Sequence, residues 1–228
     1  MQIIILAAGI GSRLGNPFPK PLTPLKNGKS IMQMQIENIS SKFDPHSIST
    51  VVGFKKNLIM EEFPDVSYIY NPVFDSTNTS KSLLRALRKH KETSVLWFNG
   101  DVVFDVALLD SLTSYIDANQ SFVAVNTSSV AEEEVKYTLK EGYIDELSKT
   151  VKIGLGEAVG INFISSNDIG AFINRLEECE LQDYFEKGLE MAIEKDGIKV
   201  QAVDISKHAC MEIDFLDDLN AANETFHS

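Results

Sequence analysis

A glycine-rich segment near the start of the chain carries two cationic side chains. It reads LAAGIGSRL over residues 6–14, and Lys20 follows within PFPKPL at residues 17–22. Glycine lets backbone N–H groups converge on an anion, and Arg13 and Lys20 would bring positive charge to the same place. The prolines beside Lys20 reduce the entropy that this segment loses when it is ordered. The segment is therefore typical of a loop that binds phosphate groups.

Two common phosphate-binding motifs do not match this loop. The dinucleotide motif G-x-G-x-x-G requires a glycine where the chain has Leu14, because the next glycine is Gly15. The letters GKS at residues 28–30 resemble the end of a P-loop, but the first glycine of that motif would fall on Thr23. We interpret GKS instead as a turn followed by the cap of a helix.

Three acidic residues later in the chain have the chemistry of magnesium ligands. Asp101 ends the run Asn99-Gly100-Asp101 after a buried apolar segment, and α/β sheets bind ligands at the carboxyl ends of their strands. Glu212 and Asp214 are separated by one residue, so in a strand both would point the same way, roughly 6.8 Å apart. Mg²⁺ takes hard oxygen ligands and bridges phosphate oxygens. We therefore predict that Asp101 binds the metal ion and that Glu212 and Asp214 can both approach one cation.

Other kinds of catalytic site have little support in the sequence. His208 and Cys210 continue the alternation of Glu212 and Asp214, but four ligands along one strand spread too far for a zinc tetrahedron. No C-x-x-C, H-E-x-x-H or G-x-S-x-G motif occurs, so neither a zinc site nor acyl transfer by a serine nucleophile is indicated.

The charge balance restricts the partners. The 228 residues include 21 Lys and Arg against 33 Asp and Glu, a net charge of −12, which disfavours nucleic acid and membrane surfaces. The two cysteines are too few for a disulfide framework. The first basic residue, Arg13, follows the apolar start of the chain, whereas a secretory signal has its positive charge before the apolar run. No apolar run is long enough to span a bilayer. We expect a soluble, cytoplasmic protein, and the sequence leaves a homodimer open.

The elements that must position these residues alternate between strands and helices. Buried apolar runs predict strands, and apolar residues at helical spacing predict helices. Strands are expected over residues 2–8, 49–53, 67–70, 95–98, 122–126, 159–164 and 198–205, with a hairpin over 135–148 that turns at Glu141-Gly142. Helices are expected over residues 31–41, 81–91, 106–118, 168–178, 183–195 and 216–225, with one or two further turns at 56–63. This order predicts an α/β fold with a mainly parallel sheet and helices on both faces.

Two acidic segments are interpreted as ordinary surface. Glu132-Glu133-Glu134 is expected in a solvated loop or helix start. Glu186, with its acidic neighbours at residues 177–194, is expected on an exposed helical face.

The first loop as a whole resembles the signature of the nucleotidyltransferases. In that family LAAGxGxRL and the lysine of a PK pair bind a nucleoside triphosphate, and the chain has LAAGIGSRL followed by PKPL. The resemblance resumes at residues 99–101 and 212–214, and residues 71–83 look like the choline-phosphate cytidylyltransferase branch, which includes phosphoglutamine-type enzymes. It implies one Rossmann-like nucleotidyltransferase domain over residues 1–228, with a mostly parallel, mixed sheet.

The resemblance also implies a role for individual residues. Lys20, Arg13, Asp101 and Asp214 would be catalytic; Asp101 and Asp214, with Glu212 beside them, would hold Mg²⁺; Lys149 and Glu157 would contact the acceptor. The nucleotide would be bound by Leu6, Ala7, Ala8, Gly9, Gly11, Ser12, Arg13, Lys20, Asn78, Thr79, Ser80, Ser82, Asn99 and Gly100.

The expected reaction is transfer of CMP from CTP to a small phosphorylated acceptor, with release of pyrophosphate. The acceptor would be phosphocholine-like or a phospho-amino acid such as phosphoglutamine. Two alternatives remain open: a sugar-1-phosphate nucleotidyltransferase that makes an NDP-sugar, and a nucleotide-sensing module without turnover.

Overall fold

The computed structural model describes residues 1–15, 17–128 and 134–226 of the chain. Strands alternate with helices along it. The strands are β1 (Gln2–Ala7), β2 (Ile48–Val52), β3 (Ser67–Tyr70), β4 (Val95–Asn99), β5 (Val102–Phe104), β6 (Phe122–Asn126), β7 (Lys136–Lys140), β8 (Tyr143–Ser148), β9 (Glu157–Ile164), β10 (Gln201–Asp204) and β11 (Cys210–Glu212). The helices are α1 (Ile31–Ser40), α2 (Lys56–Glu62), α3 (Thr79–Leu87), α4 (Leu108–Asp117), α5 (Ile169–Glu178), α6 (Phe185–Asp196) and α7 (Leu216–Thr225), with short 3₁₀ turns at Ser12–Leu14, Lys20–Leu22 and Pro45–Ser47.

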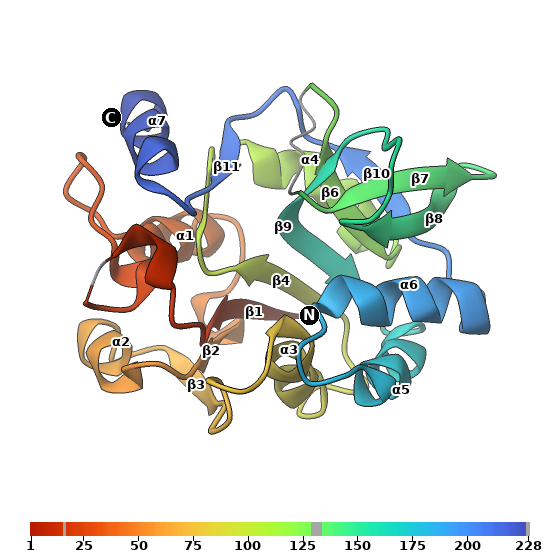
Figure 1. Cartoon of the computed structure of the whole chain (residues 1–228), viewed down its shortest axis with the longest axis horizontal. Coiled ribbons are helices and arrows are strands. Elements are labelled where there is room, and N and C mark those ends of the chain that lie inside the picture. Colours follow the sequence, from red (N-terminus) through yellow and green to blue (C-terminus); the bar gives the residue numbers. More distant parts are fainter. Residues whose placement is uncertain (16, 129–133, 227–228) are drawn as a thin grey trace.

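Within the described residues, nine strands form one mixed sheet with helices on both faces (Figure 1). The strand order is β10-β6-β9-β4-β1-β2-β3, and the hairpin β7–β8 joins β9 through β7. The α/β class predicted from the alternating pattern is confirmed. The strands β3, β2, β1 and β4 are parallel to one another, whereas β9 runs antiparallel to both β4 and β6.

The register of the central strands brings the two predicted loops to one edge. Leu6 in β1 pairs with Val51 in β2 on one side and with Asn99 in β4 on the other. The segments that follow β1 and β4 therefore leave the sheet side by side. A hydrogen bond of 3.0 Å from the Gly100 N–H to the Leu6 carbonyl joins them.

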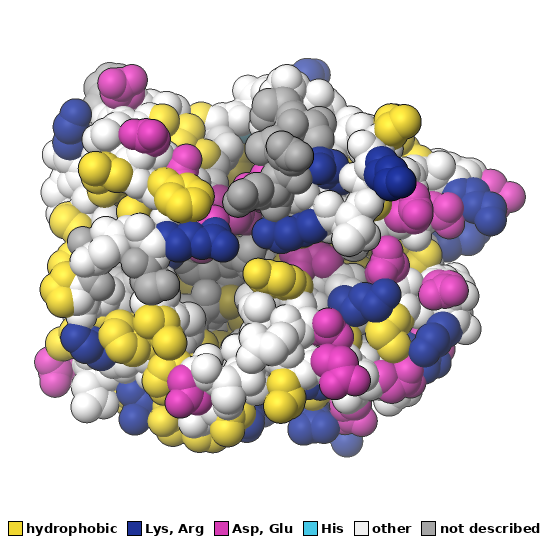
Figure 2. Space-filling view, viewed as in Figure 1, with side chains coloured by type: hydrophobic (Ala, Val, Ile, Leu, Met, Phe, Trp, Pro, Cys, Tyr) yellow, Lys and Arg dark blue, Asp and Glu magenta, His cyan; other side chains and the backbone are white. Residues whose placement is uncertain are grey.

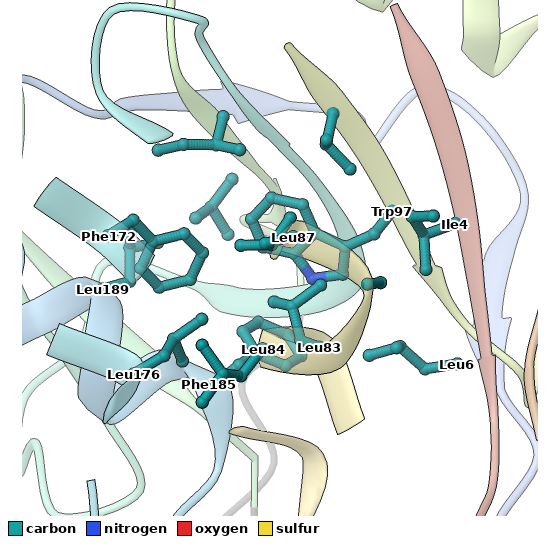
Figure 3. Close-up of a cluster of buried hydrophobic side chains, with 14 of the residues drawn as sticks. Ile4, Leu6, Leu83, Leu84, Leu87, Trp97, Phe172, Leu176, Phe185 and Leu189 are labelled. Carbon is teal, nitrogen blue, oxygen red and sulfur yellow. The ribbon is translucent and has the colours of Figure 1, made fainter. Parts of the chain in front are cut away.

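The sheet is buried on both faces because its strands are apolar at successive positions. On one face Ile4 and Leu6 pack with Trp97 against α3, α5 and α6 (Figure 3). Trp97 stacks on Phe172 with ring centroids 5.7 Å apart and meets the Phe185 ring edge-on at 5.5 Å. The contact with Phe185 fixes the first turn of α6 against the sheet.

The opposite face is covered by α1, α2 and α4. Ile3 and Ile5 of β1 pack there with Met32 of α1, Ile59 of α2 and several leucines of α4. The predicted cap of α1 is confirmed, because the Ser30 hydroxyl accepts a hydrogen bond of 3.2 Å from the Gln33 N–H.

A short ribbon outside the main sheet was not predicted. Strand β5 pairs antiparallel with β11, with Val102 opposite Glu212, and the Ile213 N–H donates to the Asp101 carbonyl over 3.0 Å. This ribbon brings Asp101 and Asp214 together although 113 positions separate them in the sequence. The predicted strand at residues 212–214 is wrong in part, because β11 ends at Glu212 and the chain then turns into α7.

The hairpin prediction is confirmed in detail. Glu141 and Gly142 connect β7 and β8, and both have positive φ, at 54° and 84°. A two-residue turn of this kind matches the twist of the strands that it joins. No helix in the described ranges has the length and apolar character needed to cross a bilayer.

Candidate active site

A cleft of about 570 Å³ opens where the loops after β1 and β4 meet. Figure 2 shows a hollow near the middle of this face, with basic side chains on two sides and acidic side chains between them. The predicted residues that line the cleft are Leu6, Ala7, Gly9, Gly11, Arg13, Lys20, Asn78, Thr79, Asn99, Gly100, Asp101, Lys149, Glu212 and Asp214. These predicted residues come from five separate parts of the chain.

Lys20 lies between the two aspartates. Its Nζ is 2.6 Å from Asp101 Oδ2 and 2.5 Å from Asp214 Oδ1, and its side chain is only 10% exposed. Burial by itself lowers the pKa of Lys20, but the two carboxylates outweigh it and raise the pKa above its ordinary value. The ammonium therefore stays charged and holds both carboxylates at one point of the cleft.

The glycine-rich loop passes close to this lysine. Gly11 has φ +62°, and a Cβ built on it would lie 2.7 Å from Lys20 Cβ. Any other residue at position 11 would be strained and would displace Lys20, so the second glycine of the motif has a clear steric reason.

Arg13 contacts the same aspartate from the rim. Its Nη1 is 3.0 Å from Asp214 Oδ2, and its guanidinium lies over the Phe215 ring at 5.6 Å. Burial alone would raise the pKa of Asp214, but Lys20 and Arg13 together lower it below the ordinary value. Asp214 is therefore ionised at neutral pH, as a metal ligand must be.

Glu212 lies behind the aspartates in a closely packed position. Asn99 Nδ2 donates to Glu212 Oε1 over 3.2 Å, and a Cβ on Gly160 would come within 2.6 Å of that oxygen. Burial, followed by the charges of Asp101 and other carboxylates, raises the pKa of Glu212 well above its usual range.

Two carboxylates of this set could hold a metal ion. Asp101 Oδ1 is buried and has no hydrogen-bond partner among the described residues, while its Oδ2 faces Lys20. Asp214 meets the same ammonium. An unpartnered carboxylate oxygen and a second ionised carboxylate are suited to Mg²⁺, which usually takes one or two protein carboxylates and completes its shell with water and phosphate. Within the described part of the chain no cluster of three or more His, Cys, Asp or Glu is arranged to bind a metal by itself.

The predicted nucleotide residues after β3 divide into two groups. Asn78 and Thr79 line the cleft and cap α3, since Asn78 Oδ1 accepts from the Thr79 N–H over 2.8 Å. Ser80 and Ser82 are buried, and Ser82 Oγ accepts a hydrogen bond of 3.0 Å from Asn71 Nδ2. The structure therefore keeps these two serines below the cleft lining. Ala8 is likewise buried rather than lining the cleft, and the side chain of Ser12 lies outside the described residues.

The far wall of the cleft is formed by the start of α6 and the end of β8. Lys149 lies over the Tyr184 ring at 5.2 Å, and Glu186 lines the same wall. Glu186 is only 8% exposed, so the expectation of an exposed acidic face is wrong at this position. The helical register turns Glu186 inward beside Phe185, whose ring is fixed in the core.

Two other acidic residues that the sequence singled out do not line the cleft. Glu134 is half-buried, and burial raises its pKa while the charge of Lys149 opposes the shift. It is thus not the freely solvated residue that was expected, and Glu132 and Glu133 lie outside the described residues. Glu157 begins β9 and pairs with Asn126 and Lys136, away from the cleft-lining set.

Several residues line the cleft that were not predicted from the sequence, most of which lie outside any recognisable motif. These are Ile10, Pro21, Phe74, Thr77, Gln182, Tyr184, Phe185 and Glu186. Pro21 could have been found within PKPL, whereas the residues near α6 reach the cleft only through the packing of that helix on the sheet.

Comparison with known families identifies the chain. The model of the MobA-like NTP transferase domain matches residues 3–160. The chain belongs to this family. The match includes the glycine-rich loop, Lys20 and Asp101, which line the cleft.

Similar proteins in this group have different names. The chain is 32% identical over 128 residues to the CMP-5′-(3-aminopropyl)phosphonate synthase of Streptomyces rubellomurinus, covering 52% of this chain and 20% of that protein. It is 31% identical over 209 residues to the bifunctional protein GlmU of Methanococcus maripaludis, covering 84% of this chain and 47% of that protein. The matched region is therefore less than half the length of either relative.

Solved structures share the fold at low sequence identity. An inositol-1-phosphate CTP transferase from T. maritima matches with a TM-score of 0.80 at 16% identity, covering 99% of this chain and 93% of that one. The CTP:phosphocholine cytidylyltransferase LicC from Streptococcus pneumoniae matches with a TM-score of 0.75 at 19% identity, covering 99% and 98%. These similarities show that the whole described sheet has the arrangement of nucleotidyltransferases.

Proposed function

We propose that this protein is a magnesium-dependent cytidylyltransferase that transfers CMP from CTP to a small phosphorylated acceptor and releases pyrophosphate. The observation that carries the proposal is the convergence of Lys20, Asp101 and Asp214 in one cleft beside the glycine-rich loop. Two basic side chains and two aspartates beside the carboxyl ends of β1 and β4 suit a triphosphate with its metal ion.

In the proposed reaction an oxygen of the acceptor phosphate attacks the α-phosphorus of CTP, and the bond to pyrophosphate breaks. No general base is needed, because a phosphate monoester is already ionised at neutral pH. Lys20 leaves the aspartates for the α-phosphate, and Arg13 stabilises the negative charge that grows on pyrophosphate. Most of the rate would come from alignment of the two substrates, which can contribute about 7–11 kcal/mol.

Asp101 and Asp214 are the residues proposed to hold Mg²⁺, and Glu212 stands beside them. When bound, the ion would neutralise phosphate charge and orient the reacting oxygens. The unpartnered Asp101 Oδ1 supports this assignment. So does the raised pKa of Glu212, since a carboxyl buried near other carboxylates is ionised more easily once a cation is present.

CTP is favoured as the nucleotide by two observations. Thr77, Asn78 and Thr79 bring short hydroxyl and amide groups to the cleft, and such groups can match the polar edge of cytosine. The similarity to a protein named as a CMP-phosphonate synthase also favours a cytidine nucleotide and a small acceptor that is not a sugar.

A sugar-1-phosphate nucleotidyltransferase remains the second candidate. The similarity to GlmU covers 84% of the chain, more than the similarity to the phosphonate synthase, and it favours this alternative. A sensor without turnover is disfavoured by the joint presence of Lys20, Asp101 and Asp214, because sensing does not require a complete metal site.

The experiment is a matrix of the four NTPs against phosphorylated metabolites, with Mg²⁺ and a pyrophosphate assay. A site that accepts a hydrogen bond from the cytosine amino group would leave its acceptor unpartnered with UTP, at a cost of about 1–3 kcal/mol. We expect CTP to exceed UTP by roughly 5- to 150-fold in kcat/KM, with ATP and GTP poorer still. Equal or faster turnover of UTP or dTTP with a sugar-1-phosphate would favour the second candidate instead.

A further inference from the structure

Among the described residues that line the cleft, Glu186 is the one carboxylate that the proposed reaction does not use. It follows Phe185 at the start of α6, is 8% exposed, and lines the wall opposite the glycine-rich loop. Its Oε2 is buried without a hydrogen-bond partner among the described residues. A buried carboxyl oxygen without a donor is costly, so its place beside a substrate cleft calls for a donor from outside the chain.

The charges around Glu186 define what that donor could be. The pKa of Glu186 is raised to about 7, chiefly by burial and to a smaller extent by the charge of Glu134, while its own backbone N–H and the charge of Lys149 act in the opposite direction. Lys149 does not supply the missing hydrogen bond, since its ammonium lies over the Tyr184 ring. Another anion near Glu186 would add repulsion to that of Glu134, whereas a cation would be attracted by both.

Lys149 also connects Glu186 to the reaction centre. Lys149 lines the same cleft as Glu186 and Asp214, and its positive charge acts on both of them and on Glu134. A phosphate held near Lys149 and the proposed metal ligands would therefore share one cleft with Glu186, as a short chain attached to that phosphate requires.

We propose that Glu186 is a specificity-determining residue whose carboxylate accepts a hydrogen bond from a protonated primary amine on the phosphorylated acceptor. This inference rests on the proposed function, because it assumes that the phosphate of the same molecule binds at the reaction centre. The substrate class is then a short phosphorylated primary amine.

The hydrogen bond to Glu186 distinguishes phosphorylated primary amines from quaternary ammonium compounds and from neutral alkyl phosphates. A quaternary ammonium has charge but no N–H, so it would leave Oε2 without a donor. A neutral alkyl phosphate would bring neither charge nor donor. An N–H donor to an ionised carboxylate has about twice the strength of a neutral hydrogen bond, so the primary amine should be selected over both.

The test is calorimetric titration of the whole protein with matched phosphate esters, in Mg²⁺, with and without a CTP analogue that cannot be cleaved at the α-phosphate. The probes are 2-aminoethyl, 3-aminopropyl and 4-aminobutyl phosphate, each paired with the alkyl phosphate of equal length, together with phosphocholine. The variants are Glu186→Gln, which keeps the shape but removes the charge, and Glu194→Gln, an exposed control on the same helix.

In the wild-type protein at least one amino ester should bind roughly 10- to 150-fold more tightly than its alkyl partner and than phosphocholine. Glu186→Gln should reduce this preference to within a few-fold, and Glu194→Gln should keep it. The proposal is overturned if no amino ester binds more tightly than its alkyl partner, if phosphocholine binds best, or if Glu186→Gln keeps the preference while remaining folded.

The outcome can be separated from a failure of the proposed function. Binding preference is measured without turnover, so it judges the role of Glu186 alone. Absence of pyrophosphate release with every NTP and every acceptor would contradict the proposed function, whatever the titrations show.

Discussion

At the residue scale, the central feature is one ammonium shared by two carboxylates. The sequence indicated that Lys20, Asp101 and Asp214 belong to one site, because each lies within a segment that resembles a family motif. It could not indicate that Lys20 contacts both aspartates, since this contact depends on the β5–β11 ribbon. It placed Glu186 on an exposed face, because a glutamate among other glutamates on a helix has no pattern that distinguishes a buried one.

Lys20→Ala tests the role of this ammonium. The charge on the phosphates grows in the transition state, so kcat should fall by about 100- to 1,000-fold while CTP binding weakens less. Lys29→Ala removes a lysine from an exposed ion pair with Glu37 and serves as the control. Steady-state kinetics with direct CTP binding would distinguish the two effects. A change confined to KM would make Lys20 a ground-state binding residue only.

Glu186 should give the protein a measurable pH dependence of stability. Its pKa of about 7 in the folded state lies above the ordinary value of 4.5, so the folded state binds this proton more tightly. The contribution of Glu186 to stability is therefore full below about pH 4.5 and is lost as the pH rises through about 7.

A glutamine cannot ionise, so the Glu186→Gln variant should not lose this part of its stability as the pH rises. Thermal unfolding without ligands gives the Tm of the variant minus the Tm of the wild type at each pH. This difference should be several degrees larger at about pH 8 than at about pH 5. An equal difference in Tm at both pH values would show that Glu186 has no raised pKa in the folded protein.

At the element scale, long and strongly patterned segments were predictable and short ones were not. The main strands and helices follow from apolar periodicity, and the hairpin follows from its Glu-Gly turn. Strand β5 has only three residues, Val102–Phe104, and its pairing partner lies more than a hundred positions later. Asp214 was placed in a strand by alternation, but its N–H donates to Asp218 Oδ2 over 2.9 Å at the start of α7.

Gly160 in strand β9 packs closely against Glu212 and Asn99, and the variant Gly160→Ala tests whether this packing matters. Gly160 has φ +69°, and a Cβ there would meet Glu212 Oε1 at 2.6 Å and Asn99 Nδ2 at 2.8 Å. The variant should lose stability and most of its activity, because both side chains must move. Gly142→Ala is the matched control, since Gly142 has φ +84° but nothing within 4 Å of a built Cβ.

The control should lose only the cost of left-handed backbone, about 1–2 kcal/mol, and should keep its activity when folded. Denaturant unfolding and the pyrophosphate assay would measure the two quantities. Activity of Gly160→Ala equal to that of Gly142→Ala would mean that the packing behind Glu212 does not matter for the reaction.

At the scale of the whole molecule, the cleft divides the chain by role. The side proposed to bind the nucleotide comes from the loops after β1 and β4 and the start of α3, within residues 3–160 that match the family. The side proposed to bind the acceptor comes in part from α6 and the segment after β11, beyond that match. The whole protein has a net charge of −12, which repels anionic substrates. The basic side chains of the cleft and the proposed metal ion must offset this repulsion.

The most direct test of the central claim follows the α-phosphorus of CTP. The wild-type protein is mixed with Mg²⁺, CTP labelled at the α-phosphorus and a short phosphorylated amine, and the labelled products are separated. The account predicts that the label moves into a product that forms only with the acceptor. It also predicts that Asp101→Asn, which keeps the shape but removes the charge, reduces this transfer by about 100-fold or more without unfolding the protein. Recovery of the label only as CTP or free CMP, or undiminished transfer by a folded Asp101→Asn variant, would contradict it.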